Sequence, residues 1–133
     1  MITKVVVDGN DGTGKTATIN KLKALMPNIE FEDRGIFSEA TLDDELFDNR
    51  KNMEKAKEFY RKVANSYGTL FVIVDADPKV CQKRILERGD SIEEEYHNMD
   101  DLKKYRDRFW RLVDMVDRLQ NVMVIDTTNR ETP

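Results

Sequence analysis

Four short apolar runs alternate along this chain with longer segments in which apolar residues recur every three or four positions. Such runs are typical of strands buried on both faces, and the longer segments are typical of amphipathic helices. We expect strands at residues 2–7, 29–31, 70–74 and 122–125, and helices at 17–26, 53–67, 78–88 and 99–119. Strands that alternate with helices predict an α/β fold with a parallel sheet of about four strands and helices on both faces.

Turn and capping residues mark the ends of these helices. Pro27 and Gly68 end the first two helices, and Gly89 ends the third. Asp77 is expected to cap the third helix, because Pro78 then takes the first helical position. The apolar side of this third helix consists of Val80, Cys81, Ile85 and Leu86. The inward side of the last helix consists of Leu102, Tyr105, Phe109, Leu112, Val113 and Val116.

Two segments have a weaker pattern. Residues 36–52 are acidic, and we expect a mobile, substrate-side segment there with one short helix near residues 42–47. Residues 91–98 are also strongly acidic and are expected to be helical. There are no repeats or linker-like stretches, so the 133 residues are expected to form one domain.

Composition narrows the classes of partner and compartment. The formal charge of −4 argues against a general attraction to nucleic acid or to anionic membranes. The single cysteine, Cys81, excludes a disulfide framework within the chain and favours a reducing compartment. No apolar run is long enough to span a membrane, and the first residues lack the pattern of a signal peptide. We therefore expect a cytoplasmic protein.

The loop after the first strand carries the most specific motif, G-N-D-G-T-G-K-T at residues 9–16. Glycines let a backbone approach phosphate oxygens closely, and its N–H groups then form an anion-binding concavity at a helix N-terminus. Lys15 is expected to contact the β- and γ-phosphates of a nucleotide, and Thr16 to bind Mg²⁺. The expected phosphate-binding residues are Gly9, Asn10, Asp11, Gly12, Thr13, Gly14, Lys15 and Thr16.

The carboxyl ends of the other strands should meet at this loop, since ligands of parallel sheets bind there. Asp33 and Arg34 end the second expected strand. Asp33 can hold Mg²⁺ through water or accept a proton from an acceptor hydroxyl, and Arg34 can bind phosphate or developing charge. The structural alternative is a strand-end ion pair with Arg34 exposed. Asp75 and the Asp126–Thr127 pair end the remaining two strands.

Arg84 and Arg88 form a second cationic group, because residues four apart share one face of a helix. They are candidates for stabilising a transferring phosphoryl group. The alternative is a solvated helix face that pairs with Glu87 or Asp90. Three further arginines lie on the last helix, where an ordinary charged face is the simpler interpretation, although the first of them could reach a lid. They are Arg106, Arg108 and Arg111.

An aspartate, the histidine and the larger aromatic residues are further candidates for a role in the site. Asp11 places a carboxylate inside an anion-binding loop, and we expect its side chain to turn toward the acceptor. His97 stands among acidic residues and is expected at the surface. Trp110 and the tyrosines, at helical spacing, are expected to pack rather than to stack on bases. No group of histidines and cysteines suggests zinc.

These motifs resemble those of P-loop nucleoside and nucleotide kinases, and most closely the thymidylate-kinase-like branch with its small phage-encoded versions. The motifs are the loop at residues 9–16, Asp33-Arg34 followed by Ser38, V-D-A-D-P at 74–78 and R-I-L-E-R-G at 84–89. The resemblance implies a three-layer P-loop kinase fold with a lid-like segment around 84–98 and a substrate-side segment around 35–52.

The resemblance also implies roles for individual residues. Asp11 would contact the sugar hydroxyl of the acceptor. Asp33 and Arg34 would serve metal, acceptor and phosphate, with Ser38 on the substrate side. Arg84 and Arg88 would close over the transferring phosphoryl group. The segment 126–129, and Thr127 in particular, would pass near the adenine of ATP.

This chain departs from the family pattern in two places. The long helical acceptor-binding region expected before the Asp33-Arg34 strand is absent, so the acceptor pocket would have to be rebuilt from residues 36–52. No helical pattern follows the last strand. Both departures predict a more open site, which suits a bulky acceptor or a partner subunit.

Three functions are compatible with these observations. The first is an ATP- and Mg²⁺-dependent kinase that acts on a nucleoside, a nucleoside monophosphate or a related acceptor. The second has the same chemistry on a polynucleotide hydroxyl, such as 5-hydroxymethyluracil in phage DNA. The third is a non-enzymatic nucleotide-binding module. A homodimer could form through the helix at 53–67 or through residues 102–116.

Overall fold

The computed structural model describes residues 1–91 and 97–130, and four parallel strands form its centre. The order of the strands in the sheet is β2-β1-β3-β4. Their bounds are β1 (Lys4–Asp8), β2 (Glu30–Asp33), β3 (Thr69–Asp75) and β4 (Val122–Asp126). The four expected strands are thus confirmed, and each extends to the polar residue at its carboxyl end. Because β1 lies between β2 and β3, the loop that follows it is flanked by both neighbouring strand ends.

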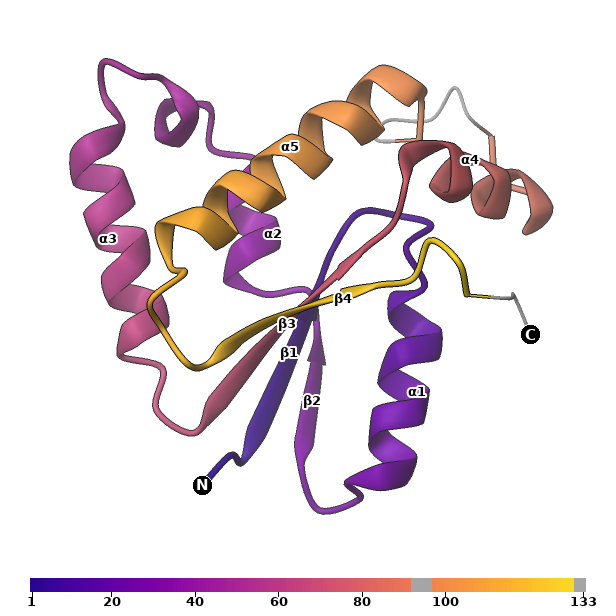
Figure 1. Ribbon diagram of the computed structural model, residues 1–133, viewed down its shortest axis with the longest axis horizontal. Helices are drawn as coiled ribbons and strands as arrows, with labels where there is room; N and C mark the ends of the chain where they lie inside the picture. The colour runs from indigo at the N-terminus through magenta and orange to yellow at the C-terminus, as the bar shows by residue number, and fades with distance from the viewer. Residues whose placement is uncertain (92–96, 131–133) are drawn as a thin grey trace.

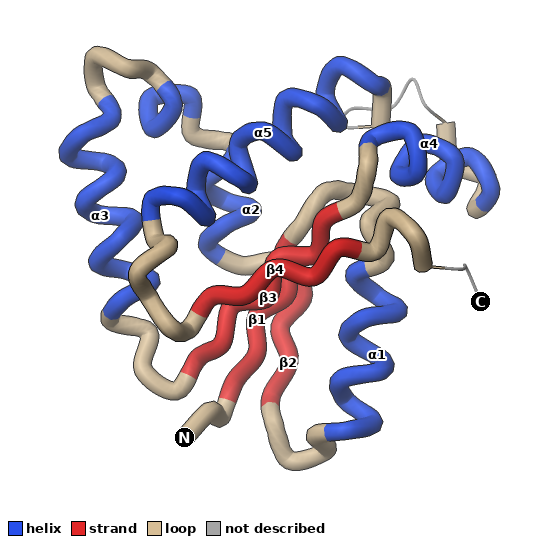
Figure 2. Tube along the Cα trace, in the orientation of Figure 1, coloured by secondary structure: helices blue, strands red, loops and turns tan. Residues whose placement is uncertain are grey.

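Helices cover both faces of this sheet (Figures 1 and 2), so the expected three-layer α/β architecture is confirmed. The helices are α1 (Lys15–Leu25), α2 (Ile36–Thr41), α3 (Asn52–Ala64), α4 (Pro78–Glu87) and α5 (Met99–Met115), with a 3-10 turn η1 (Asp44–Phe47). α1 lies on one face, and α2, α3 and α5 lie on the other. α4 packs against α5 near the carboxyl ends of the strands.

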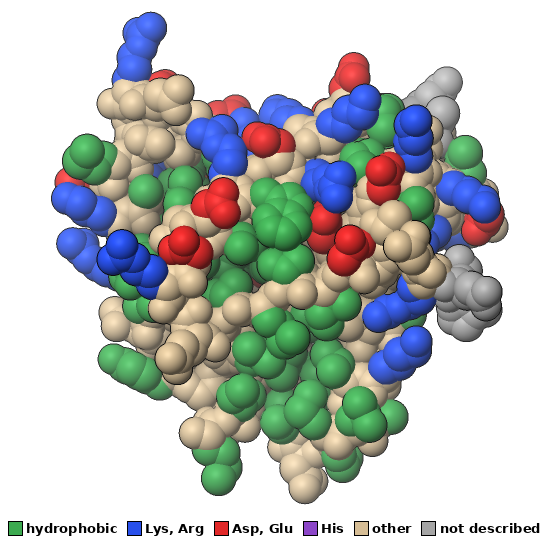
Figure 3. Space-filling model, viewed as in Figure 1, with side chains coloured by type: hydrophobic (Ala, Val, Ile, Leu, Met, Phe, Trp, Pro, Cys, Tyr) green, Lys and Arg blue, Asp and Glu red, His purple; other side chains and the backbone are tan. Residues whose placement is uncertain are grey.

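Alternation along the strands decides which valines face which layer. Val6, Phe71 and Ile73 point to the layer of α2, α3 and α5. Val5, Val7, Val72 and Val74 point to the other face, where Ile19 of α1 packs. Charged side chains gather over the upper half of the molecule in Figure 3, and apolar side chains gather over the strands below them.

The segment 36–52 is more ordered than the sequence predicted. It contains α2 at its start, and a single 3-10 turn at 44–47 where a short helix was expected. Phe37 and Leu46 anchor the segment in the main core. Asp43 caps the turn by accepting from Glu45 N at 3.1 Å.

Three smaller expectations have different outcomes. Asp77 does cap α4, since its side chain accepts from Lys79 N at 2.8 Å with Pro78 in the first turn. Of the apolar side expected for α4, Cys81 and Ile85 lie in the core, whereas Val80 is half-buried and Leu86 is 52% exposed. The helix expected at 91–98 falls largely on residues 92–96, outside the described part of the chain.

Within residues 1–91 and 97–130, no helix is long and apolar enough to cross a membrane.

Phe37 connects α2 to the core through two aromatic contacts. Its ring centroid lies 5.0 Å from that of Phe59, edge-on, and 5.5 Å from that of Phe71. Replacing Phe37 with alanine removes a fully buried ring, and we expect a loss of about 3–5 kcal/mol in the free energy of unfolding. Chemical denaturation measures this loss, and Tyr67→Ala at an exposed position is the control. A loss below about 1 kcal/mol would contradict this packing.

Candidate functional site

The loop between β1 and α1 needs its glycines for two reasons. Gly12 and Gly14 have φ angles of 79° and 89°, in the left-handed region that side chains rarely adopt. A Cβ atom on Gly12 would also lie 2.5 Å from the carbonyl oxygen of Cys81. Thr13 Oγ1 donates to the carbonyl of Asn10 at 2.7 Å and closes the loop from within. The result is a tight turn at the N-terminus of α1, where backbone N–H groups are available to an anion.

Lys15 folds back over this loop. Its Nζ atom donates to the carbonyls of Gly9 at 3.0 Å and Asn10 at 2.9 Å, and the residue is only 7% exposed. Burial lowers the pKa of Lys15, and the nearby charge of Arg34 lowers it further. Thr16 follows in the first turn of α1 and is exposed. The ammonium group is therefore held directly above the anion-binding turn.

Asp8, the last residue of β1, caps α2 from outside that helix. The helix begins after Gly35, which has no side chain to act as a cap. Asp8 Oδ1 instead accepts from Gly35 N at 2.7 Å and Ser38 N at 3.3 Å, and it also accepts from Ser38 Oγ. The Ser38 hydroxyl proton is thereby committed to Asp8, so Ser38 presents lone pairs to any other partner. No local pattern predicts this contact, because 27–30 residues separate the partners.

Arg34 leaves the end of β2 in a rare conformation. Its φ is 68°, and it is the sole non-glycine residue of the described ranges with a positive φ. Such a conformation costs of order 1–3 kcal/mol and is concentrated at functional sites. Its guanidinium Nη2 donates to Asp11 Oδ1 at 3.0 Å, so the pairing with Asp33 considered from the sequence is not formed. Asp33 is exposed, and its carboxylate makes no hydrogen bond or ion pair with the described residues.

Three basic side chains contact the carboxylate of Asp11. Besides Arg34, it is contacted by His97 Nε2 at 2.7 Å and by Arg88 Nη2 at 3.8 Å. Burial acts to raise the pKa of Asp11, but the hydrogen bond from His97 and the surrounding cations outweigh burial and hold that pKa below its usual value. The carboxylate is thus ionised at neutral pH and partly neutralised by its neighbours.

The prediction that His97 lies at the surface is wrong. The residue is 5% exposed, because its ring lies between the Asp11 carboxylate and the carbonyl oxygen of Ser91, 3.0 Å from Nδ1. Sequence reasoning missed this contact because 86 residues separate His97 from Asp11. One signal was present, since a carboxylate in an anion-binding loop needs a compensating cation.

Arg84 and Arg88 serve different sides of the loop, although they share a helix face. Arg84 donates to the carbonyl of Gly12 at 3.2 Å and to the carbonyl of Thr127 at 2.7 Å. Thr127 Oγ1 in turn donates to the Thr13 carbonyl at 2.5 Å. Arg84 therefore connects the loop between β1 and α1 to the segment after β4. Arg88 instead extends to Asp90 and Asp11.

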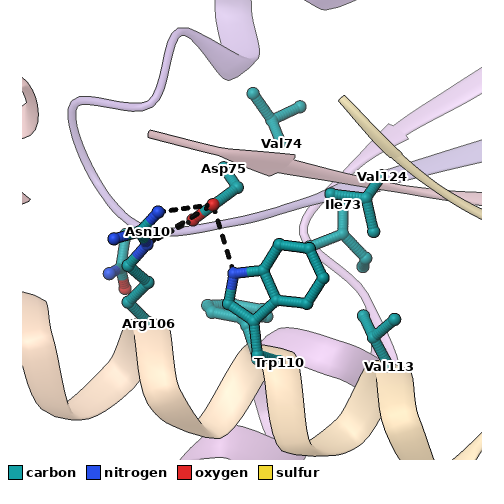
Figure 4. Close-up of a pocket in the computed structure, with 9 residues that line it drawn as sticks. Asn10, Ile73, Val74, Asp75, Arg106, Trp110, Val113 and Val124 are labelled. Atoms are coloured by element: carbon teal, nitrogen blue, oxygen red, sulfur yellow. Dashed lines mark hydrogen bonds and ion pairs between the residues drawn. The ribbon is translucent and has the colours of Figure 1, made fainter. Parts of the chain in front are cut away.

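A third cluster attaches α5 to the end of β3 (Figure 4). Arg106 contacts both oxygens of the buried Asp75 at 3.0 Å, and Trp110 Nε1 donates to Asp75 Oδ2 at 3.1 Å. The expectation that Arg106 lies on an ordinary charged face is therefore wrong, because the Asp75 carboxylate is covered by α5. Nearby, Asn10 Nδ2 donates to the carbonyl of Leu102 at 2.8 Å, so α5 also contacts the loop directly.

Replacing Arg106 with methionine should leave the Asp75 carboxylate buried without its partner. Breaking a buried pair costs about 3–5 kcal/mol, and the partial exposure of Arg106 places the expected loss near the lower end of that range. Chemical denaturation measures the loss. In the double variant Asp75→Asn with Arg106→Met, the charge is gone, and most of the lost stability should return. Equal losses in the single and double variants would contradict this account.

A pocket of about 270 Å³ opens beside the loop. Asp11, Arg34 and Ser38, the three residues expected on the substrate side, all line it. Leu42 also lines it, together with Tyr105 and Phe109 of α5. The pocket therefore combines a cationic side, hydrogen-bond acceptors and an aromatic wall within reach of the loop.

Comparison with known proteins adds one finding. No family model matches the chain, and no curated protein matches it. Among solved structures, the chain is similar to a deoxyadenosine kinase from M. mycoides with bound dCTP, with a TM-score of 0.63 and 12% sequence identity. The match covers 92% of this chain and 89% of that one. The chain therefore shares the fold of that deoxyadenosine kinase.

Proposed function

We propose that this protein is an ATP- and Mg²⁺-dependent phosphotransferase that moves the γ-phosphate of ATP to a nucleoside or nucleoside monophosphate. The observation that carries the proposal is the junction of two sites at Asp11 and Arg34. One is the anion-binding loop with Lys15, and the other is the 270 Å³ pocket. A donor and an acceptor bound in these two sites would meet beside the cations, as phosphoryl transfer requires.

On the donor side, the loop amides and Lys15 would hold the phosphates of ATP. Arg84 would keep the loop aligned with the segment at Thr127, along which the adenine would lie. Arg34 and Arg88 have exposed guanidinium groups that can turn toward the transferring phosphoryl group. Their positive charge would stabilise the oxygens that carry negative charge in the transition state.

The described residues fit Mg²⁺ better than a metal bound by protein alone. They contain no cluster of three or more histidine, cysteine or acidic side chains that could hold a metal ion. Mg²⁺ usually keeps several waters and binds through one or two protein oxygens plus substrate phosphates. The exposed hydroxyl of Thr16 would supply one of those oxygens, and the exposed carboxylate of Asp33 would hold the ion through a water molecule and so stay available to the acceptor. The bound ion would neutralise charge on the phosphates during transfer.

On the acceptor side, the aromatic wall at Tyr105 and Phe109 suits a planar base, and Ser38 would accept a hydrogen bond from it. Because Asp11 already pairs with Arg34, Arg88 and His97, Asp33 is the better candidate to take the proton of an acceptor hydroxyl. Residues 35–52 would form the substrate side, and the lid expected at 84–98 falls partly on residues 92–96, outside the described part of the chain. A thymidylate-kinase-like origin, with phage-encoded relatives, is part of the same proposal.

An acceptor screen with radiolabelled ATP tests this function. Purified protein is incubated with Mg²⁺ and, separately, with nucleosides, nucleoside monophosphates and DNA that contains 5-hydroxymethyluracil. We expect label in a nucleoside or mononucleotide product. Label in DNA alone would contradict the proposed acceptor, and ATP binding without transfer to any of these would instead indicate a nucleotide-binding module.

A further inference from the structure

We propose that His97 is a positioning residue of the transfer site, which as an imidazolium holds the loop carboxylate Asp11 in place and neutralises it while phosphates are bound. The inference rests on the proposed function and assigns a role to the chain's single histidine. It starts from the two hydrogen bonds of the ring, from Nε2 to Asp11 at 2.7 Å and from Nδ1 to the Ser91 carbonyl at 3.0 Å.

Hydrogen-bond chemistry determines the protonation state of this ring. A carbonyl oxygen and an ionised carboxylate are both acceptors, and a neutral imidazole has only one N–H to donate. Both bonds therefore form together only when both ring nitrogens carry protons. The carboxylate cannot supply the missing proton while Arg34 Nη2 donates to its other oxygen at 3.0 Å and cations surround it. His97 and Asp11 thus form a charge-assisted pair.

Arg34 and Arg88, the other two basic residues at Asp11, can move away from its carboxylate more easily than His97 can. The side chains of Arg34 and Arg88 are 57% and 45% exposed, whereas that of His97 is 7% exposed and is held at both nitrogens. When a phosphoryl group arrives, the two arginines can turn toward it. His97 remains on Asp11, so the carboxylate inside the loop does not repel the incoming phosphates.

A second contact shows that the start of α5 is fixed to the same loop. Asn10, the neighbour of Asp11, donates from Nδ2 to the Leu102 carbonyl at 2.8 Å. Asn98 caps α5 by accepting from Asp101 N at 2.9 Å, so the residue after His97 begins a regular helix. Two adjacent loop side chains therefore hold the segment 97–102, and this rigidity fixes the imidazole relative to Asp11.

The first test reads the protonation state directly by nitrogen NMR of the ring. Since the chain has one histidine, both ring-nitrogen signals come from His97. We expect both nitrogens of the ligand-free wild-type protein to be protonated at neutral pH. In Asp11→Asn, the carboxylate is gone while Arg34 and Arg88 stay nearby, so the ring should instead have one bare nitrogen at pH 7. A wild-type ring with one bare nitrogen at neutral pH would overturn the inference.

The second test is a double-variant cycle measured on kcat/KM for ATP, with the best acceptor from the screen. His97→Gln keeps a neutral donor but removes the charge, and we expect a loss of about 10–100-fold. In the Asp11→Asn background, the same change should cost less than about 3-fold, because no carboxylate is left to neutralise. Equal costs in both backgrounds, or no cost in either, would overturn the inference. Absence of any transfer would contradict the proposed function only, and the NMR result would still decide the state of His97.

Discussion

Replacing Lys15 with alanine should lower the rate of phosphate transfer by about 10³-fold or more, the scale on which one lost transition-state cation acts. The reason is positional, since two backbone carbonyls of the loop hold the ammonium group beside the anion-binding turn. Steady-state kinetics with the acceptor from the screen measures the effect. Thermal melting should show that the variant still folds.

Lys23→Ala is a matched control, because Lys23 is an exposed lysine on the same helix, about two turns after Lys15. Its rate should stay within about 2-fold of the wild-type rate, as expected for a surface substitution without contacts to the site. If Lys15→Ala were as active as this control, the loop would not hold the transferring phosphate, and the proposed function would be wrong.

Replacing Asp33 with asparagine should lower kcat by about 10²–10⁴-fold, the usual contribution of a general base. The carboxylate is exposed at the end of β2 and makes no hydrogen bond or ion pair with the described residues, so the change should leave stability nearly unaltered. Binding of ATP without Mg²⁺ should also be retained. Kinetics at saturating substrate and calorimetry of ATP binding separate these effects.

Glu32→Gln provides the control for this change, because Glu32 is the adjacent acidic residue of β2 and pairs with Lys4 away from the loop. We expect its kcat to match that of the wild-type protein. A loss of kcat in Asp11→Asn but not in Asp33→Asn would transfer the role of the base from Asp33 to Asp11.

Much of the fold was predictable because its signals are local. Strand runs at Val5–Val7 and Leu70–Val74, and helix signals at Asp77 and Pro78, depend on neighbours within a few positions. The sequence signal of the loop between β1 and α1 is local as well, since its glycines form a turn that is complete within eight residues. The short helix α2 was missed because its cap comes from Asp8, a residue of another element.

The site was predictable only in part, because many of its contacts join residues that are far apart in the sequence. Arg34 could be placed beside the loop because strand ends of a parallel sheet converge, whereas Ser38 was assigned to the substrate side only by the resemblance to P-loop kinases. The partners of those residues could not be assigned, since they depend on how α4 and α5 pack. Arg106 pairs with Asp75 and His97 with Asp11 across 31 and 86 residues, and a single-sequence pattern does not say which distant residue supplies such a contact.

The left-handed backbone of Arg34 has a consequence for binding. Hydrogen bonds hold the chain on both sides of this residue, from Arg34 N to the Val7 carbonyl at 2.8 Å and from Gly35 N to Asp8 at 2.7 Å. The backbone that directs the guanidinium is therefore ordered when the protein folds, before any ligand arrives. An acceptor then loses less affinity to the ordering of the backbone at Arg34. The strain at this one residue is the cost of a backbone that is already preorganised for the acceptor.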